Sequence, residues 1–268
     1  MIENKRNFKV VTEKNPRIIL PNMLTIIGVC IGLSSIKFAL DQNYGLAIIA
    51  VLIAGIMDGL DGRIARLIKG TSKVGKELDS LTDVVSFGVA PAFIMYFWVL
   101  NELGKLGWLI SLIYVVCCAL RLARFNITTH TEEAAWKENF FEGVPSPAGA
   151  GLALLPLVFS MSEIYYFENY KLLISSIILP LISILMISKI PTYSLKKITI
   201  PRSTTIFLLF GVCLYFGMVI IYTFKVLFIS GIVYLAFIPI SFIHYKKLKN
   251  KNEASKQNDE IEEIEDVL

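Results

Sequence analysis

The sequence has few of the residues that hold small disulfide-rich or zinc-dependent domains together. Its 268 residues include four cysteines and two histidines. The cysteines lie inside apolar runs and none shows CxxC spacing, so we interpret them as small buried hydrophobic residues. His130 and His244 are too few and too far apart to suggest a metal site. Neither a disulfide framework nor a zinc site is therefore expected.

The chain also lacks the polar composition of a water-soluble domain. It is 55% hydrophobic, with a mean hydropathy of +0.64, whereas soluble domains are about 45–50% apolar. Eight segments approach the roughly twenty apolar residues that cross a bilayer as a helix. They span residues 18–39, 44–66, 78–100, 106–125, 145–165, 172–190, 204–224 and 226–245. We expect an all-α, polytopic integral membrane protein with a bundle of about eight transmembrane helices.

The ends of the chain carry no apolar core. Residues 1–17 are basic and polar, so a cleavable signal peptide is not expected; the segment is either a short helix on the membrane surface or a disordered tail. Residues 18–245 form the expected transmembrane domain, and the charged tail 246–268 is expected to be disordered. With eight spans, 22 of the 26 lysines and arginines share a side with both termini. The positive-inside rule then places the termini in the cytoplasm of a cell-membrane protein.

Four aspartates interrupt this apolar pattern, in the stretch DGLDGRIARLIKGTSKVGKELDSLTD from Asp58 to Asp83. Asp58 and Asp61 are three residues apart, and Asp79 and Asp83 are four apart, so each pair shares one helical face. Carboxylates crowd together only when something cancels their charge, and a hard divalent cation does so. Two such ions can hold the attacking and leaving oxygens of a displacement at phosphorus. The structural alternative is a set of ion pairs along a polar seam.

The residues between the two pairs suit a phosphate ligand. Gly62 and Gly75 leave bare backbone that a bulky ligand can approach closely. Arg66 can pair with a phosphate through its fork of donors.

The spacing D-x2-D-G-x2-A-R-x8-G-x3-D-x3-D resembles the signature of the CDP-alcohol phosphotransferase family. The chain fills it without departure through Asp58, Asp61, Gly62, Ala65, Arg66, Gly75, Asp79 and Asp83. The resemblance implies a homodimer in which two divalent cations, Mg²⁺ or Mn²⁺, are bound by Asp58, Asp61 and Asp79, with Asp83 adjoining. It also implies that Asp83 is the general base. The CDP part of a lipid is then expected to contact Gly62, Ala65, Arg66, Ser72 and Gly75.

The first span begins Pro21-Asn22-Met23-Leu24-Thr25. Asn22 and Thr25 suit helix capping and backbone hydrogen bonding. The P-N-x-x-T stretch also resembles the first helix of the family, which implies that both residues help to hold the nucleotide diphosphate.

Two further stretches resemble one branch of the family, the membrane-bound phosphatidylserine synthases. They are R-L-A-R-F-N from Arg121, and F-x-G-x-P-S-P-A, which contains Ser146. The resemblance implies transfer from CDP-diacylglycerol or CDP-archaeol to the hydroxyl of L-serine, with release of CMP. Arg121, Arg124, Asn126 and Ser146 are then the candidates for the serine side. Alternatively, the arginines snorkel to lipid headgroups, and Ser146 only starts a helix.

Two other functions stay open. Within the family, the acceptor can be glycerol 3-phosphate or an inositol phosphate instead of serine. Outside it, intramembrane acids also line cation transporters. Transporter sites lie near the midplane, often between repeated halves, whereas this cluster is near one face and the sequence shows no repeat. Membrane lipids are expected partners, and nucleic acid is not.

Overall fold

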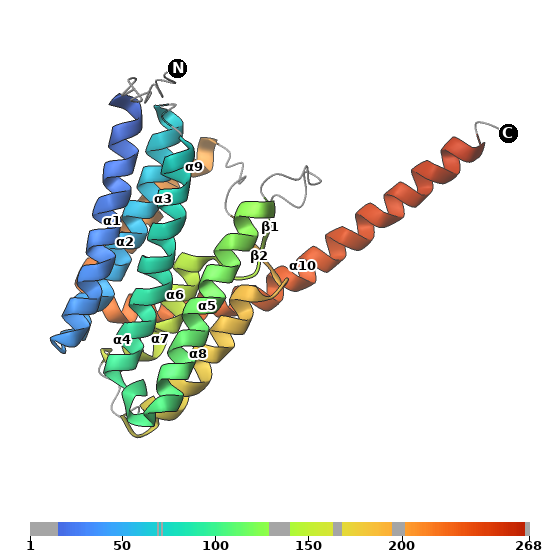
Figure 1. Cartoon of the computed structure of the whole chain (residues 1–268). Helices are drawn as coiled ribbons and strands as arrows, with labels where there is room; N and C mark the ends of the chain where they lie inside the picture. The colour runs from blue at the N-terminus through green and yellow to red at the C-terminus, as the bar shows by residue number, and fades with distance from the viewer. Residues whose placement is uncertain are drawn as a thin grey trace, which may run out of the picture.

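The computed structural model describes residues 16–68, 70, 72–128, 140–162, 168–194 and 202–265 (Figure 1). Residues 1–15, which make up most of the basic N-terminal segment, lie outside this part of the chain. The described residues are almost all helical, and six helices are long and apolar enough to cross a membrane. The prediction of an all-α, polytopic membrane protein is therefore confirmed.

The first half of the chain is a set of long helices joined by short links. They are α1 (Pro16–Leu40), α2 (Tyr44–Leu67), α3 (Lys73–Asp83), the π-helical turn η1 (Val84–Val89), α4 (Ala90–Trp98), the 3₁₀ turn η2 (Leu100–Leu103) and α5 (Lys105–Thr128). Together α3, η1 and α4 form one continuous span, Val74–Trp98, so the second aspartate pair lies within it.

The second half is less regular. It contains β1 (Phe140–Glu142), α6 (Ser146–Ala153), α7 (Leu155–Ser160), the 3₁₀ turn η4 (Glu168–Tyr170), α8 (Lys171–Ile187), β2 (Pro191–Tyr193), α9 (Arg202–Ile221) and α10 (Thr223–Glu265). The two short strands, which the sequence did not suggest, pair antiparallel with Phe141 opposite Thr192.

The eight expected spans are not equally long. Six correspond to spanning helices, and a seventh is α8, whose seventeen residues extend about 26 Å. The expected span 145–165 is instead divided at Leu154 into α6 and α7. Pro156 stands in the first turn of α7, where it has no amide proton to donate and its ring opposes a helical carbonyl four residues earlier. The proline therefore accounts for the break.

The charged tail also differs from the expectation of disorder, because α10 continues as a helix to Glu265. Residues 240–265 contain no glycine, and no proline follows Pro239. A helix that is already formed within the apolar span needs no new nucleation to extend into such a segment.

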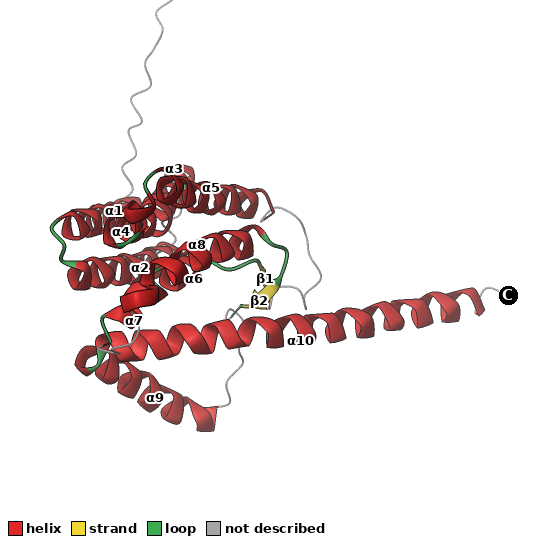
Figure 2. Cartoon of the chain, turned by 90° about the horizontal axis from the view of Figure 1, so that it is seen from below, coloured by secondary structure: helices red, strands yellow, loops and turns green. Residues whose placement is uncertain are grey.

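The last two helices lie to one side of the bundle. Figure 2 shows α10 between α9 and the other helices, in agreement with its contacts to α7, β2 and α9. No residue of the apolar stretch of α9 is buried. Most of the core is therefore formed by α1 to α8, where side chains such as Phe87, Met95, Leu157 and Met186 are fully buried, and α10 adds Ile238.

The π-helical turn is tied to the neighbouring helices on two sides. The buried Tyr114 hydroxyl of α5 donates a hydrogen bond to the Phe87 carbonyl (2.9 Å). On the other side α1 comes so close that a Cβ atom on Gly32 would collide with the side chain of Ser86. The Gly28–Gly32 step, for which packing within the chain or between protomers was expected, therefore packs within the chain. π turns often lie at functional sites, and this one follows Asp83 directly.

Gly32→Ala should destabilise the fold. The added methyl group must displace Ser86, and overpacking of this kind costs about 1–3 kcal/mol. Gly28→Ala is the matched control, because its Cβ would lie 3.6 Å from the Met57 Cβ, an ordinary contact. Thermal unfolding in detergent should show a lower midpoint for the Gly32 variant alone. Equal midpoints for both variants would contradict this packing.

Candidate functional site

The four aspartates come together from two helices. Asp58 and Asp61 lie near the end of α2, and Asp79 and Asp83 lie on the last turns of α3. One carboxylate oxygen from each of Asp58, Asp61 and Asp79 lies within 4.8 Å of the others. Asp83 lies within Coulombic range of Asp58 and Asp79. The arrangement is the one that the three- and four-residue spacings predict.

This donor set suits a hard divalent cation. Asp61 is 3% exposed, and the Asp83 Oδ1 atom is buried without a hydrogen-bond partner. Among the described residues, no lysine or arginine forms an ion pair with these aspartates. Carboxylates this close repel each other unless a proton or a cation lies between them, and oxygen ligands are those that Mg²⁺ and Mn²⁺ prefer. The polar-seam alternative requires ion pairs with cationic side chains, and the described residues form none with these aspartates.

A polar cavity of about 480 Å³ opens beside the acidic cluster, between α1, α2 and α3. Its walls include every residue expected to contact the CDP part of a lipid. The lining residues are Pro21, Asn22, Thr25, Asp61, Gly62, Ala65, Arg66, Gly70, Ser72, Gly75, Lys76 and Asp79. The sequence did not single out Pro21, Gly70 or Lys76 as ligand contacts. The basic character of the link between the helices was the only signal for Lys76.

Short contacts hold two walls of this cavity in place. The Thr25 hydroxyl of α1 lies 2.6 Å from Asp61 Oδ2 and 3.0 Å from the Pro21 carbonyl oxygen. At the start of α3, the Ser72 hydroxyl caps the helix by accepting from the Gly75 amide (2.9 Å). A Cβ atom on Gly75 would lie 2.8 Å from Asn22 Oδ1, so only glycine lets α1 approach α3 this closely. Asn22, Thr25, Ser72 and Gly75 therefore have structural roles as well as cavity-facing positions.

A second polar group lies near Asp83. Arg121 of α5 is 8% exposed, and its Nη1 donates to the Ser146 hydroxyl at the start of α6 (2.7 Å). Asp83 lies within Coulombic range of this guanidinium. Two of the four residues expected on the serine side are therefore in direct contact, next to the predicted base.

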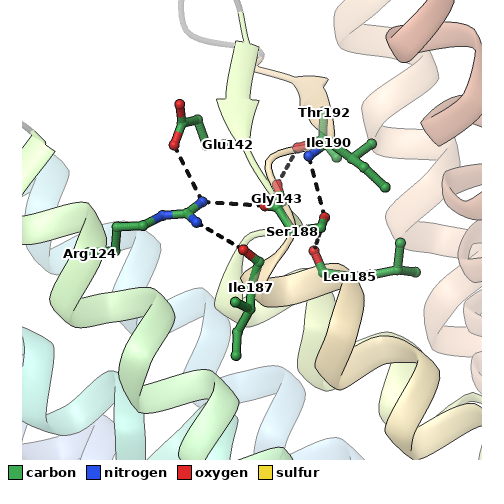
Figure 3. A network of polar contacts seen from close by, with 8 residues as sticks. All are labelled: Arg124, Glu142, Gly143, Leu185, Ile187, Ser188, Ile190 and Thr192. Carbon is green, nitrogen blue, oxygen red and sulfur yellow. Dashed lines mark hydrogen bonds and ion pairs between the residues drawn. The ribbon is translucent and has the colours of Figure 1, made fainter.

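The other two residues expected on the serine side, Arg124 and Asn126, contact other parts of the chain. Arg124 donates from Nη1 to the Ile187 carbonyl (2.9 Å) and from Nη2 to the Ser188 carbonyl (3.3 Å), and lies 3.4 Å from Glu142 Oε2 (Figure 3). These contacts satisfy carbonyls at the C-terminal end of α8, where a cation is also favourable. Asn126 donates to the Ser80 hydroxyl (2.9 Å) and so connects α5 with α3. The arginine spacing alone did not distinguish the buried Arg121 from Arg124.

Comparison with known proteins agrees with this geometry. The family model described as CDP-alcohol phosphatidyltransferase matches residues 18–187, well over half of the chain. The chain belongs to this family. Its members are enzymes, so the acidic cluster and its cavity are the candidate active site.

The names of similar proteins indicate which members of the family the chain resembles. The chain is 34% identical over 226 residues to the CDP-diacylglycerol–serine O-phosphatidyltransferase of Mycobacterium tuberculosis strain H37Rv, covering 83% of this chain and 78% of the relative. Its identity to the enzyme of the same name from Helicobacter pylori strain 26695 is 40% over 187 residues, covering 69% of this chain and 76% of the relative. An archaetidylserine synthase from Methanothermobacter thermautotrophicus is 34% identical over 178 residues, which cover 65% of this chain and 69% of the relative.

Thr25→Val should weaken divalent-metal binding. The substitution removes the hydroxyl that orients the Asp61 carboxylate, and the loss of such a supporting hydrogen bond typically costs about 10–100-fold in metal affinity. Titration of the purified protein with Mn²⁺, followed by electron paramagnetic resonance, measures the affinity directly. Thr25→Ser keeps the hydroxyl and should bind like the wild type. Unchanged affinity in the valine variant would contradict a metal role for Asp61.

Proposed function

We propose that the chain is a phosphatidylserine synthase that transfers the phosphatidyl or archaetidyl group of a CDP-activated lipid to the hydroxyl of L-serine and releases CMP. The observation that carries the proposal is the position of Asp83, between the other three aspartates and the Arg121–Ser146 pair. The names of the relatives supply the donor and the acceptor: CDP-diacylglycerol and serine in the bacterial enzymes, and an archaetidylserine product in the archaeal one.

The cavity between α1, α2 and α3 is the proposed site for the CDP part of the donor. Arg66 lies on its wall within Coulombic range of Asp79, so its guanidinium can meet a phosphate next to the acidic cluster. Lys76 adds a second cationic side chain. Beyond its own turn of helix, no atom of the described residues lies within 4 Å of the position that a Cβ on Gly62 would take, which leaves the Gly62 backbone open to the ligand.

Asp58, Asp61 and Asp79 would hold two divalent cations, Mg²⁺ or Mn²⁺, with Asp83 adjoining. Bound there, the cations would supply positive charge to the pyrophosphate of the donor and to its leaving group. Four carboxylates alone would repel that pyrophosphate.

The proposed reaction is a displacement at the lipid-bearing phosphorus. Asp83 accepts the proton of the serine hydroxyl, whose oxygen forms the new bond to phosphorus. The bond from that phosphorus to the bridging oxygen breaks, and CMP leaves with the electron pair. Arg66 stabilises negative charge on the phosphoryl oxygens while this occurs.

Arg121 is the proposed contact for the acceptor, with Ser146 beside it. The Arg121 guanidinium is buried and has a neutral hydroxyl as its hydrogen-bond partner, so an anionic group of the substrate would compensate the positive charge of Arg121. Arg124 and Asn126 are proposed to act indirectly, by holding α8 and α3 against α5.

The orientation and assembly of the protein belong to the same proposal. The predominance of lysine and arginine near both termini supports a cytoplasmic active site in the cell membrane, where water-soluble serine and CMP exchange. We also propose a homodimer, to which the unburied apolar surface of α9 is available.

Asp83→Asn should abolish turnover while donor binding survives. The amide keeps the shape of the side chain but cannot accept the proton, and loss of a general base lowers the rate by about 10²–10⁴-fold. CMP release and CDP-lipid binding should be measured on the same preparation. Asp79→Asn should lower metal affinity and activity together, and Asp41→Asn, an exposed residue paired with Lys37, is the surface control. Near-normal turnover in the Asp83 variant would remove its assignment as the base.

The purified protein should release CMP from a CDP-lipid only when L-serine and a divalent metal are both present. A panel of labelled acceptors containing L-serine, glycerol 3-phosphate and inositol 1-phosphate distinguishes the members of the family. A labelled lipid product with serine alone supports the proposal. Transfer to a phosphorylated acceptor instead, or turnover that survives a chelator, would contradict it.

A further inference from the structure

A set of interacting polar residues that do not line the donor cavity includes Asp83. It consists of Asp83, Arg121, Ser146, Thr192 and Tyr234, from α3, α5, α6, β2 and α10 respectively. Arg121 lies within Coulombic range of both Asp83 and Tyr234, and Thr192 is a polar neighbour of Tyr234. We call these five residues the acceptor cluster. It includes a residue of α10, a helix for which the sequence suggested no chemistry.

Three atoms of the acceptor cluster have no hydrogen-bond partner among the described residues. They are Asp83 Oδ1, Arg121 Nε and the Tyr234 hydroxyl oxygen, all of which are buried. The neighbouring groups are already engaged, since Ser146 accepts from Arg121 and the Thr192 hydroxyl donates to the Gly143 carbonyl (2.8 Å). Buried polar groups are costly to leave unpaired, so three in one cluster indicate a ligand that pairs with them.

The chemistry of the three atoms defines that ligand. Arg121 and Tyr234 present N–H and O–H donors, and Arg121 carries a buried positive charge without an ion-pair partner among the described residues. Donors beside a buried cation suit a carboxylate. Asp83 presents an acceptor, which suits a hydroxyl or an ammonium group. A small amino acid with a hydroxyl group carries all of these.

Tyr234 also closes the cluster against an apolar region. The same residue lines a cavity of about 380 Å³ whose other walls come from α2, η1, α6, α7 and neighbouring residues of α10, among them Gly55, Phe87 and Leu155. Gly55 lies one turn before Asp58, and Phe87 lies one turn after Asp83. Tyr234 therefore contributes both to the wall of this apolar cavity and, through its buried hydroxyl, to the acceptor cluster.

We propose that Tyr234 is a specificity-determining residue, whose hydroxyl donates a hydrogen bond to the carboxylate of the amino-acid acceptor while Arg121 neutralises its charge. The proposal rests on the proposed function, since it concerns the acceptor of that reaction. It assigns α10 a part in substrate selection. It also explains how a site near lipid headgroups can favour serine over a similar alcohol without a carboxylate, because such an alcohol would leave both donors unpaired.

The test is Tyr234→Phe, which removes the hydroxyl and keeps the ring. The KM for L-serine should rise about 10- to 100-fold, as expected for a lost hydrogen bond to a charged group. The KM for the CDP-lipid and the kcat at saturating serine should stay within about twofold of wild type. The inhibition constant of serinol, in which a hydroxymethyl group replaces the carboxylate, should also be unchanged. Tyr215→Phe, at an exposed position on α9, is the matched control.

The measurements distinguish a hydrogen bond from Tyr234 to serine from a purely structural role and from a role in donor binding. If Tyr234→Phe raised the KM for serine and the inhibition constant of serinol equally, Tyr234 would only support the fold. If it raised the KM for the CDP-lipid, the cluster would bind the donor. Either result overturns the proposal. If Tyr234→Phe does not fold, Tyr234→Met, which keeps apolar bulk, is measured in its place. A wild-type protein that releases no CMP with serine refutes the proposed function itself, whereas an active wild type with an unchanged serine KM in the variant refutes this inference alone.

Discussion

The mutual repulsion of four carboxylates is the constraint on which the rest of the structure depends. Two helices bring Asp58, Asp61, Asp79 and Asp83 together inside an apolar bundle, where charge is poorly solvated. Such an arrangement needs a proton or a cation between the carboxylates, and the described part of the chain supplies no ion-paired lysine or arginine. The acidic cluster therefore suits a divalent cation, and with it the phosphate-bearing substrate that we propose.

In the proposed arrangement, the surrounding fold separates the two substrates around this centre. Contacts between α1, α2 and α3, fixed by Thr25 and by the close approach of Asn22 to Gly75, form the donor side. On the other side, the π-helical turn, α5, α6 and α10 enclose the acceptor cluster. Asp83 ends α3 between them, the position in which one carboxylate can face both a cation and the proton that it removes.

Sequence patterns predicted the parts of this architecture that depend on local spacing. Hydrophobic length predicted the spanning helices, and the three- and four-residue intervals predicted which aspartates share a face. Features that depend on tertiary contacts were not predictable in this way. The Arg121–Arg124 pair looks symmetrical in sequence, yet packing against Ser146 buries one side chain and the end of α8 binds the other. Likewise, no motif marks Tyr234, because only the folded chain brings this residue of α10 within Coulombic range of Arg121.

We propose that these aspartates bind divalent cations that contact the pyrophosphate of a CDP-lipid. Anomalous X-ray diffraction from crystals grown with Mn²⁺ and a CDP-lipid locates such ions. We expect manganese peaks bounded by Asp58, Asp61 and Asp79, with Asp83 adjoining and the pyrophosphate oxygens on the same ions. Manganese elsewhere, or aspartates neutralised by lysine and arginine side chains with the pyrophosphate bound apart from them, would contradict it.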